Sequence, residues 1–488
     1  MAGLARAIAV LGAVSVIGTV TQVAKGKLGA LLLGAAGVGV LNQLTTLYSL
    51  LFIVAGLGFF NGMIRHITLA VKDGDGGRAR AQMNSVCLFL GATSLVITIG
   101  CLLASGWISD LLFADRGERA AYVALVVLAV PIAVQQRVFR AYLNAMRDLQ
   151  GIARAQTAAD VTSVVIFAVG AWFYGIWGAI AAFVAMHALL LVGMAAYAVK
   201  SGGAGLALPS AKRFRWSQVR ANFGYGINGL VMTAAAAGTA IVIGRLIITE
   251  YDLAQAGIFS VAFKVATVYL GALYSAAGSY YFPSLVRISA DRALEQEANR
   301  AVALYMTILP PIIVGLIALG DILIPLLFSE EFRPAVVVMA GLLLGDIFRV
   351  TSETMGLTML ARKRLLPYTG LYLLYTVGFI SLSWWLLPTQ GLVGVAYAYI
   401  VMRMLDFALI LIACRRTLGI GLDAIGAKPL LLALMAVAPL AAAEFFDTTL
   451  LLKLGLAIGV GLAWLALSWH LPEPTKLRTA LIEKLTKR

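Results

Sequence analysis

The sequence has little charge, cysteine or histidine, and each shortage excludes a class of protein. Only 12% of the 488 residues are charged, whereas a soluble domain usually carries about 25%. The three cysteines lie far apart, without a CxxC spacing, and the three histidines form no ligand spacing with them. We therefore expect no disulfide framework, metal site or cofactor, and predict that Cys87, Cys101 and Cys414 are buried free thiols.

Long polar segments are also missing, so no soluble module is expected. Apolar residues make up 61% of the chain, and its mean hydropathy is +0.92. With so little charge to wet a surface, lipid must be the solvent for most of the chain. The 49 glycines agree with this, because small residues let membrane helices pack closely. The longest connection, 200–220, is basic, and no P-loop occurs, so the chain holds no ATPase or transferase domain.

Fourteen stretches are apolar and long enough to cross a bilayer, which takes about 20 residues. The sequence therefore predicts an all-α polytopic membrane protein with spans at 7–33, 38–64, 84–108, 120–142, 155–175, 177–199, 224–248, 254–282, 302–328, 335–360, 367–387, 392–413, 429–446 and 451–470. The first stretch is interpreted as a span and not as a signal peptide, because its apolar run is long and lacks a convincing cleavage site.

Positive charge is distributed unevenly among the connections. With both termini in the cytoplasm, 28 of the 38 Lys and Arg residues fall on the cytoplasmic side, and four fall outside: Arg116, Arg119, Arg333 and Lys453. The positive-inside rule then predicts a multi-pass protein of the bacterial inner membrane with both termini cytoplasmic. Because topology explains the net charge of +15, the lipid bilayer is the expected partner and nucleic acid is not.

The sequence also repeats itself weakly. A shift of 220 residues aligns small residues and one cation: Gly18-Thr19 with Gly238-Thr239, Lys25 with Arg245, Ala36-Gly37 with Ala256-Gly257, and Gly58 with Gly278. Spans 1–6 and 7–12 are therefore expected to form two parallel six-helix lobes, followed by two additional helices. The predicted boundaries are 1–200, 201–413 and 414–488, the last including a basic cytoplasmic tail. Two related lobes with a site between them are a recurrent plan of transporters.

The region 15–66 resembles a known family. An N-terminal span that ends near Lys25, followed by LGAAGVGVLNQLTTLYSLLFIVAGLGFFNGMIRHI, looks like the opening of Wzx-type O-antigen and polysaccharide flippases. These belong to the MATE-like MOP superfamily, which also holds lipid II flippases. Ala35-Ala36 stand where many relatives have a proline. The resemblance implies a flippase that moves an undecaprenyl-pyrophosphate-linked oligosaccharide from the cytoplasmic to the periplasmic leaflet, with polysaccharide polymerase machinery as a further partner.

Once 28 cations are assigned to the cytoplasmic side and four to the outer side, six remain inside the spans, where each costs about 2.5–3.5 kcal/mol and must face water or a partner. They are Lys25, Lys27, Arg245, Lys264, Arg349 and Arg403. Lys25, Arg245 and Lys264 have no acidic neighbour within a helical turn, and we expect them, with Lys27, to line a cavity that binds pyrophosphate. Snorkelling to the membrane surface is the alternative for Lys25 and Lys27. Polar residues at helical spacing are expected to extend the cavity: Ser15, Thr19 and Gln22 on the first span, and Asn42 and Thr46 on the second.

The remaining two cations have acidic partners at helical spacing. Arg349 lies between Asp346 and Glu353, and Arg403 precedes Asp406 by three residues. Two interpretations stay open: local neutralisation that serves helix packing, or a proton- or sodium-responsive site that couples an ion gradient to transport.

Two other functions compete with the flippase. A MATE-type drug exporter would share the architecture, but a cationic drug should favour an acidic residue in the early spans, and the first two spans contain none. A polymerase or glycosyltransferase should carry catalytic groups on a sizeable outer loop, which the short loop at 109–119 does not provide. We therefore expect a transporter and not an enzyme.

Overall fold

The computed structural model describes residues 2–202, 210–223, 227–266, 281–282, 284–446 and 448–468. Within these ranges all the regular elements are helices. The chain divides by compactness into two units, Met1–Gly257 (unit 1) and Ile258–Arg488 (unit 2). Part of the predicted span 254–282, the aligned Gly278 and the basic C-terminal tail lie outside the described residues.

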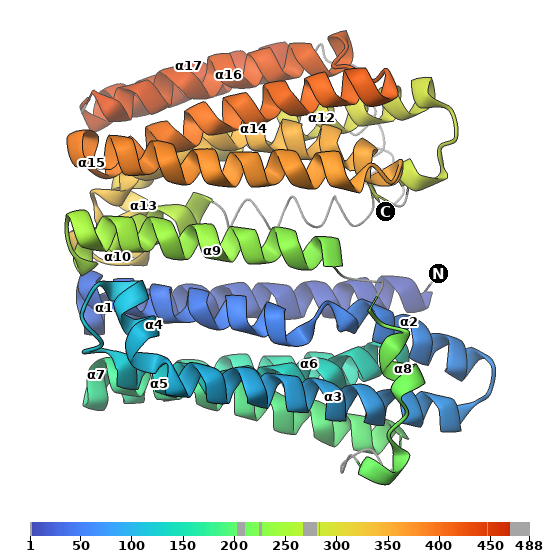
Figure 1. Cartoon of the computed structure of the whole chain (residues 1–488). Helices are drawn as coiled ribbons and strands as arrows, with labels where there is room; N and C mark the ends of the chain where they lie inside the picture. The colour runs from blue at the N-terminus through green and yellow to red at the C-terminus, as the bar shows by residue number, and fades with distance from the viewer. Residues whose placement is uncertain are drawn as a thin grey trace. The chain divides into compact units, whose positions relative to one another are not determined.

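The elements of each unit are drawn in Figure 1. Unit 1 holds α1 (Ala2–Gly56), α2 (Phe59–Lys72), α3 (Gly76–Leu103), α4 (Ser105–Phe113), α5 (Ala120–Val127), α6 (Ala129–Ala145), α7 (Leu149–Gly202), η2 (Ala211–Arg213), α8 (Trp216–Arg220), α9 (Ile227–Glu250) and the start of α10 (Leu253–Lys264). Unit 2 holds the rest of α10, α12 (Asp291–Ala318), α13 (Gly320–Leu327), η4 (Glu330–Phe332), α14 (Ala335–Ala361), α15 (Leu365–Leu418), α16 (Ala424–Phe445) and α17 (Leu450–Ser468).

Three of these helices fold back on themselves at a glycine. Gly34 in α1, Gly175 in α7 and Gly391 in α15 have φ of 66°, 56° and 62°, a region that side chains with a Cβ disfavour. Residues on either side of the turn then meet: a Cβ placed on Gly178 would lie 1.8 Å from the carbonyl oxygen of Gly170. We call the end of each unit where these turns lie the hairpin end.

The number of crossings agrees with the sequence. In the described residues, nine helices are long and apolar enough to cross a membrane, and the shorter Leu253–Lys264 and Leu450–Trp464 are also apolar. Because α1, α7 and α15 each cross twice, these helices account for the fourteen predicted spans. The predicted fold class is therefore confirmed.

The internal repeat is visible in the element bounds. Helices α7 and α15 both have 54 residues, and their ends and central glycines are all 216 positions apart. Helices α3 and α12 both have 28 residues, with both ends 215 positions apart. The repeat is thus slightly shorter in these elements than the 220 residues seen near the first span, because the connections of the two halves differ in length.

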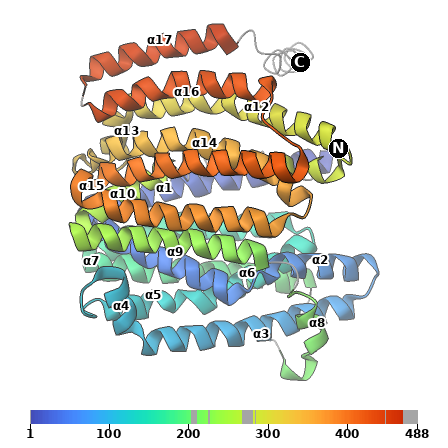
Figure 2. The ribbon, with the colours of Figure 1, turned by 45° about the horizontal axis from the view of Figure 1, so that its top comes forward.

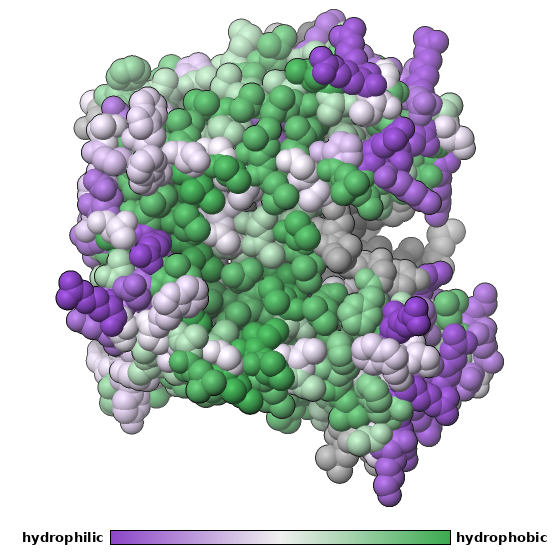
Figure 3. All heavy atoms as spheres, viewed as in Figure 1, coloured by the Kyte–Doolittle hydropathy of each residue, from purple (hydrophilic) through white to green (hydrophobic). Residues whose placement is uncertain are grey.

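Several boundaries were predicted wrongly because hydropathy marks contact with lipid, whereas helices continue into water. The predicted span 302–328 is α12, which begins at Asp291 and ends at Ala318. The predicted span 38–64 is broken between α1 and α2, where Leu57 and Gly58 have positive φ. The middles of the helices nonetheless expose apolar side chains, and hydrophilic ones gather at the ends (Figure 3). A bilayer accounts for this pattern.

The last described helix of unit 2 is held to its neighbours by ion pairs. Helix α17 lies along α12 and α16 (Figure 2). The Lys453 ammonium lies 2.8 Å from a carboxylate oxygen of Asp321 and 2.8 Å from one of Glu444. Lys453 is 4% exposed, so this cation links helices within unit 2 and is not a loop residue.

Candidate functional site

Lys25 lies where α1 packs on α7. Its ammonium donates a hydrogen bond to the Ser163 hydroxyl at 3.1 Å and lies 3.4 Å from the Met186 sulfur. Asp160, one turn before Ser163, is close enough to interact electrostatically with Lys25. Lys25 therefore has no acidic neighbour on its own helix, as the sequence indicates, but α7 supplies one.

A chain of hydrogen bonds extends from Asp160 to a second cation. The Gln156 amide donates to both carboxylate oxygens of Asp160 at 3.2 Å, and the Arg140 guanidinium donates to the Gln156 carbonyl at 3.3 Å. Arg137 lies within electrostatic range of Arg140. Lys25 and Arg140 are therefore within electrostatic range of Asp160, and Arg137 adjoins Arg140, so the group has an excess of positive charge.

His187 completes this group. Its imidazole lies against Tyr48, with ring centroids 4.9 Å apart, and within electrostatic range of Lys25. The side chain is buried, and neither ring nitrogen has a hydrogen-bond partner among the residues that the structure describes. A buried polar group without a partner costs free energy, so its retention often reflects function. We call the following residues the unit 1 polar cluster: Lys25, Arg137, Arg140, Gln156, Asp160, Ser163 and His187.

The predicted polar stripe is present but partly satisfied by its own helix. The side chains of Ser15, Thr19 and Gln22 are exposed, and those of Asn42 and Thr46 are half-buried. The Thr19 hydroxyl donates to the Ser15 carbonyl, and that of Thr46 donates to the Asn42 carbonyl. Their hydroxyl groups therefore need no cargo to be satisfied.

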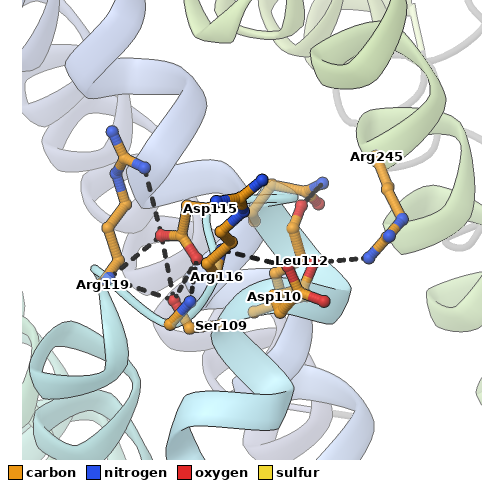
Figure 4. Close-up of polar contacts among 9 residues, drawn as sticks. Ser109, Asp110, Leu112, Asp115, Arg116, Arg119 and Arg245 are labelled. Carbon is orange, nitrogen blue, oxygen red and sulfur yellow. Dashed lines mark hydrogen bonds and ion pairs between the residues drawn. The ribbon is translucent and has the colours of Figure 1, made fainter.

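The other three cations that were expected to line the cavity lie elsewhere. Lys27 is half-buried on α1. Lys264 ends α10, is exposed although protein surrounds it closely, and has no hydrogen bond or ion pair with a described residue. Arg245 is on α9, and its guanidinium donates to the carbonyl oxygen of Asp110 in the last turn of α4 (Figure 4). The contacts of Arg245 and Lys25 thus involve different residues.

The connection after α4 is organised by Asp115 (Figure 4). Its carboxylate accepts hydrogen bonds from the Ser109 hydroxyl, from the backbone N–H of Gly117 and Arg119, and from the Arg119 guanidinium. Burial raises the pKa of Asp115, but these hydrogen bonds outweigh it and hold the pKa below its ordinary value. The ionised carboxylate therefore fixes this loop.

Unit 2 brings the predicted paired charges together in a second group. Arg349 makes an ion pair with Asp346 at 2.9 Å, as their spacing predicts, and the Tyr399 hydroxyl also donates to Asp346. Arg403 lies 3.6 Å from a carboxylate oxygen of Asp406. The unit 2 charge cluster consists of Asp346, Arg349, Ser352, Glu353, Tyr375, Tyr399, Arg403 and Asp406.

The second pair is held by neighbouring helices. The Ser352 hydroxyl donates to Asp406 at 2.8 Å, and the Arg403 guanidinium lies over the Tyr375 ring, 3.8 Å from its centroid. Glu353 is half-buried and makes no ion pair within 4 Å with a described cation, although its charge is felt by both arginines. Two arginines and two aspartates balance, and Glu353 is a third carboxylate for which the described part of the chain supplies no matching cation.

Sequence reasoning missed Arg140, Gln156, Asp160 and His187. One signal was available, because Asp160 is a carboxylate in the apolar span 155–175, and intramembrane carboxylates usually have a function. The pairing of Lys25 with α7 could not be inferred, because it depends on how two helices far apart in sequence are rotated against each other.

Comparison with known proteins agrees with the fold and the expected family. The chain is 24% identical over 390 residues to the lipid III flippase of Escherichia coli (strain K12), which covers 79% of this chain and 91% of that protein. The similar lipid III flippase of Shigella flexneri gives the same values.

Solved structures share the fold. The lipid II flippase MurJ in an inward closed conformation has a TM-score of 0.70 at 16% identity and covers 95% of this chain and 98% of its own. An inward-facing multidrug resistance MATE transporter of the MOP superfamily has a TM-score of 0.64 at 16% identity and covers 82% and 96%. These proteins are flippases and transporters and not enzymes. Residues 30–337 match the family model described as polysaccharide biosynthesis protein, and the chain belongs to that family.

Proposed function

We propose that this protein flips an undecaprenyl-pyrophosphate-linked oligosaccharide from the cytoplasmic to the periplasmic leaflet by alternating access. The unit 1 polar cluster carries the proposal, because three cations outnumber one carboxylate among apolar helices. Such a site suits an anion. The names of the similar lipid II and lipid III flippases favour a lipid-linked precursor as the cargo.

The cations can compensate the negative charge of this cargo. A pyrophosphate cannot cross hydrocarbon without compensation, whereas its polyprenyl chain can remain in lipid. One cation about 4 Å from a phosphate charge contributes about 4 kcal/mol at an effective dielectric constant near 20. Lys25, together with Arg137 and Arg140, can therefore offset much of the desolvation.

Lys264 is the second expected contact for the cargo. Its side chain is accessible although protein surrounds it, which suits a cation that lines a hydrated space. In unit 1, Lys27 and the stripe formed by Ser15, Thr19 and Gln22 would line a hydrated surface along α1. The exposed hydroxyl and amide groups of the stripe can contact sugar or water.

The unit 2 charge cluster is proposed to couple flipping to a proton or sodium gradient. Glu353 makes no ion pair with a described cation, so a proton or metal cation bound there would leave the Asp346–Arg349 pair intact. The protein is proposed to reside in the inner membrane with both termini cytoplasmic and to hand its cargo to polysaccharide polymerase machinery.

A MATE-type exporter is the second candidate, and Asp160 favours it because a carboxylate can bind a cationic drug. The surrounding Lys25, Arg137 and Arg140 oppose it, because they would repel such a drug.

Flipping by Lys25 variants tests the proposed function. Lys25→Ala in proteoliposomes should lower the rate of flipping of a polyprenyl-pyrophosphate oligosaccharide by at least about tenfold, because it removes a contact worth up to about 4 kcal/mol. Lys25→Arg keeps the charge and should retain most of the rate, and Ser163→Ala removes the hydrogen bond alone. Equal flipping by Lys25→Ala and the unchanged protein would refute the cationic site.

A further inference from the structure

The most deeply buried residues of α9 lie in one part of the helix. It packs on α1 and α4. Its buried residues, among those whose side chains are described, all lie between Ile241 and Ile247, near the hairpin end, and residues 229–240 contain none. The helix is thus buried most deeply near the hairpin end, whereas residues 229–240 are half-buried or exposed.

The start of α10 touches α1 through backbone atoms. A Cβ on Gly257 would lie 2.0 Å from the carbonyl oxygen of Ala35, and one on Gly39 would lie 2.3 Å from the carbonyl oxygen of Leu253. Real Cβ atoms do not approach so closely, so glycine is required at both positions for this contact. Glycines allow such close helix approach without interlocking side chains.

Hydrogen bonds link α1, α4 and α9 near these glycines. The Gln43 amide is 1% exposed and reaches the carbonyl oxygens of Leu112 in α4 and Ile241 in α9 at 3.4 and 3.3 Å. The Arg245 guanidinium donates to the Asp110 carbonyl (Figure 4). The carbonyls of Asp110 and Leu112 belong to the last turn of α4, where water can satisfy them equally well when the contact opens.

We infer that Gly39, Gln43, Asp110, Gly244, Arg245 and Gly257 form a reversible outer gate, closed in this structure, that must open to release the cargo. We call this group the α9 seal. Backbone contact at the glycines and three side-chain hydrogen bonds to carbonyls let α1, α4, α9 and the start of α10 pack closely. The same contacts can separate at little cost in free energy. Arg245 is then a positioning residue of the gate and not a cargo ligand. The inference rests on the proposed function for its direction, because the hairpin end is outer only if both termini are cytoplasmic.

A disulfide across the seal tests whether it must open. A Cβ on Gly244 would lie 2.7 Å from the Gln43 side-chain carbonyl carbon, so the two positions adjoin each other across the seal, and a disulfide between cysteines placed there would lock it. In a chain whose native cysteines are replaced, oxidation of Gln43→Cys/Gly244→Cys should lower flipping by at least about tenfold, and reduction should restore it. The single variants under the same oxidant show whether the oxidant itself matters. A disulfide that forms without slowing flipping would overturn the inference.

A labelling experiment tests the gate independently of the proposed cargo, because the reaction with maleimide does not require transport. A membrane-impermeant maleimide added from outside should react slowly with Gly244→Cys. Adding Gly257→Ala should raise that rate by about tenfold, because the methyl group cannot fit against Ala35 and holds the seal open. Gly238→Ala on α9 is the matched control, since a Cβ there meets nothing within 4 Å, and it should leave the rate unchanged. Equal rates in both backgrounds would overturn the gate whether or not the protein flips lipids.

Discussion

Asp160 sets the net charge of the unit 1 polar cluster, because it is the one carboxylate among the cluster's three cations. At the residue scale, the sequence predicted the chemistry of intramembrane cations but not their partners. Lys25 was identified because an unpaired cation in an apolar helix is unusual. Its neighbours on α7 depend on helix rotation and packing, which a single sequence does not encode locally.

Replacing Asp160 separates the two candidate functions. Asp160→Asn keeps the shape and adds one net positive charge beside Lys25, so an anionic cargo should bind more tightly. We expect a KM for flipping lower by about tenfold, which corresponds to about 1.4 kcal/mol, measured in proteoliposomes against Asp160→Glu as the control of equal charge. A drug exporter predicts the reverse, since loss of the carboxylate would abolish uptake of a cationic dye.

The Asp346–Arg349 pair can be separated into its structural and coupling contributions. Asp346→Ala leaves a buried guanidinium uncompensated and should lower the free energy of unfolding by about 3–5 kcal/mol. Replacing both partners, Asp346→Leu with Arg349→Met, should recover most of that loss in thermal unfolding. If the recovered double variant flips with an unchanged dependence on pH and sodium, the pair serves packing alone and has no part in coupling.

At the element scale, the repeat was easier to predict than the helix ends. The fourteen apolar stretches are evident from hydropathy along the sequence. The repeat relates α7 to α15, which are hairpins of equal length that turn at Gly175 and Gly391. The ends were missed at α12, whose first turns are polar. The break after Gly56 was missed because a positive φ at Leu57 leaves no trace in hydropathy.

The loop at Asp115 provides a test at this scale. A carboxyl group whose pKa is lowered in the folded state stabilises the loop above its ordinary pKa, about 3.9, and loses this effect as pH falls through the lower folded value. Hydrogen exchange of the Gly117 and Arg119 amides, corrected for the intrinsic rate, should stay slow at pH 5 and accelerate only below about pH 4. Asp115→Asn should exchange rapidly at every pH, and slow exchange in that variant would contradict the role of the charge.

At the scale of the whole molecule, charge placement and hydropathy lead to the same arrangement. Apolar side chains cover the middles of the helices, and the connections away from the hairpin end carry most of the cations. Positive charges near span ends resist transfer across the membrane, so the more cationic side remains in the cytoplasm. The hairpin end, with the α9 seal and the Asp115 loop, would then face the periplasm.

Two exposed loop positions test this orientation with equal structural cost. Arg116 at the hairpin end has φ of 53°, and Lys363 at the opposite end has φ of 58°, so a cysteine is equally strained at either. In intact cells with a permeable outer membrane, an impermeant maleimide should label Arg116→Cys, and should label Lys363→Cys only after the inner membrane is opened. The reverse pattern would place the cationic connections outside. It would also make the α9 seal a cytoplasmic gate, one that admits cargo before flipping instead of releasing it afterwards.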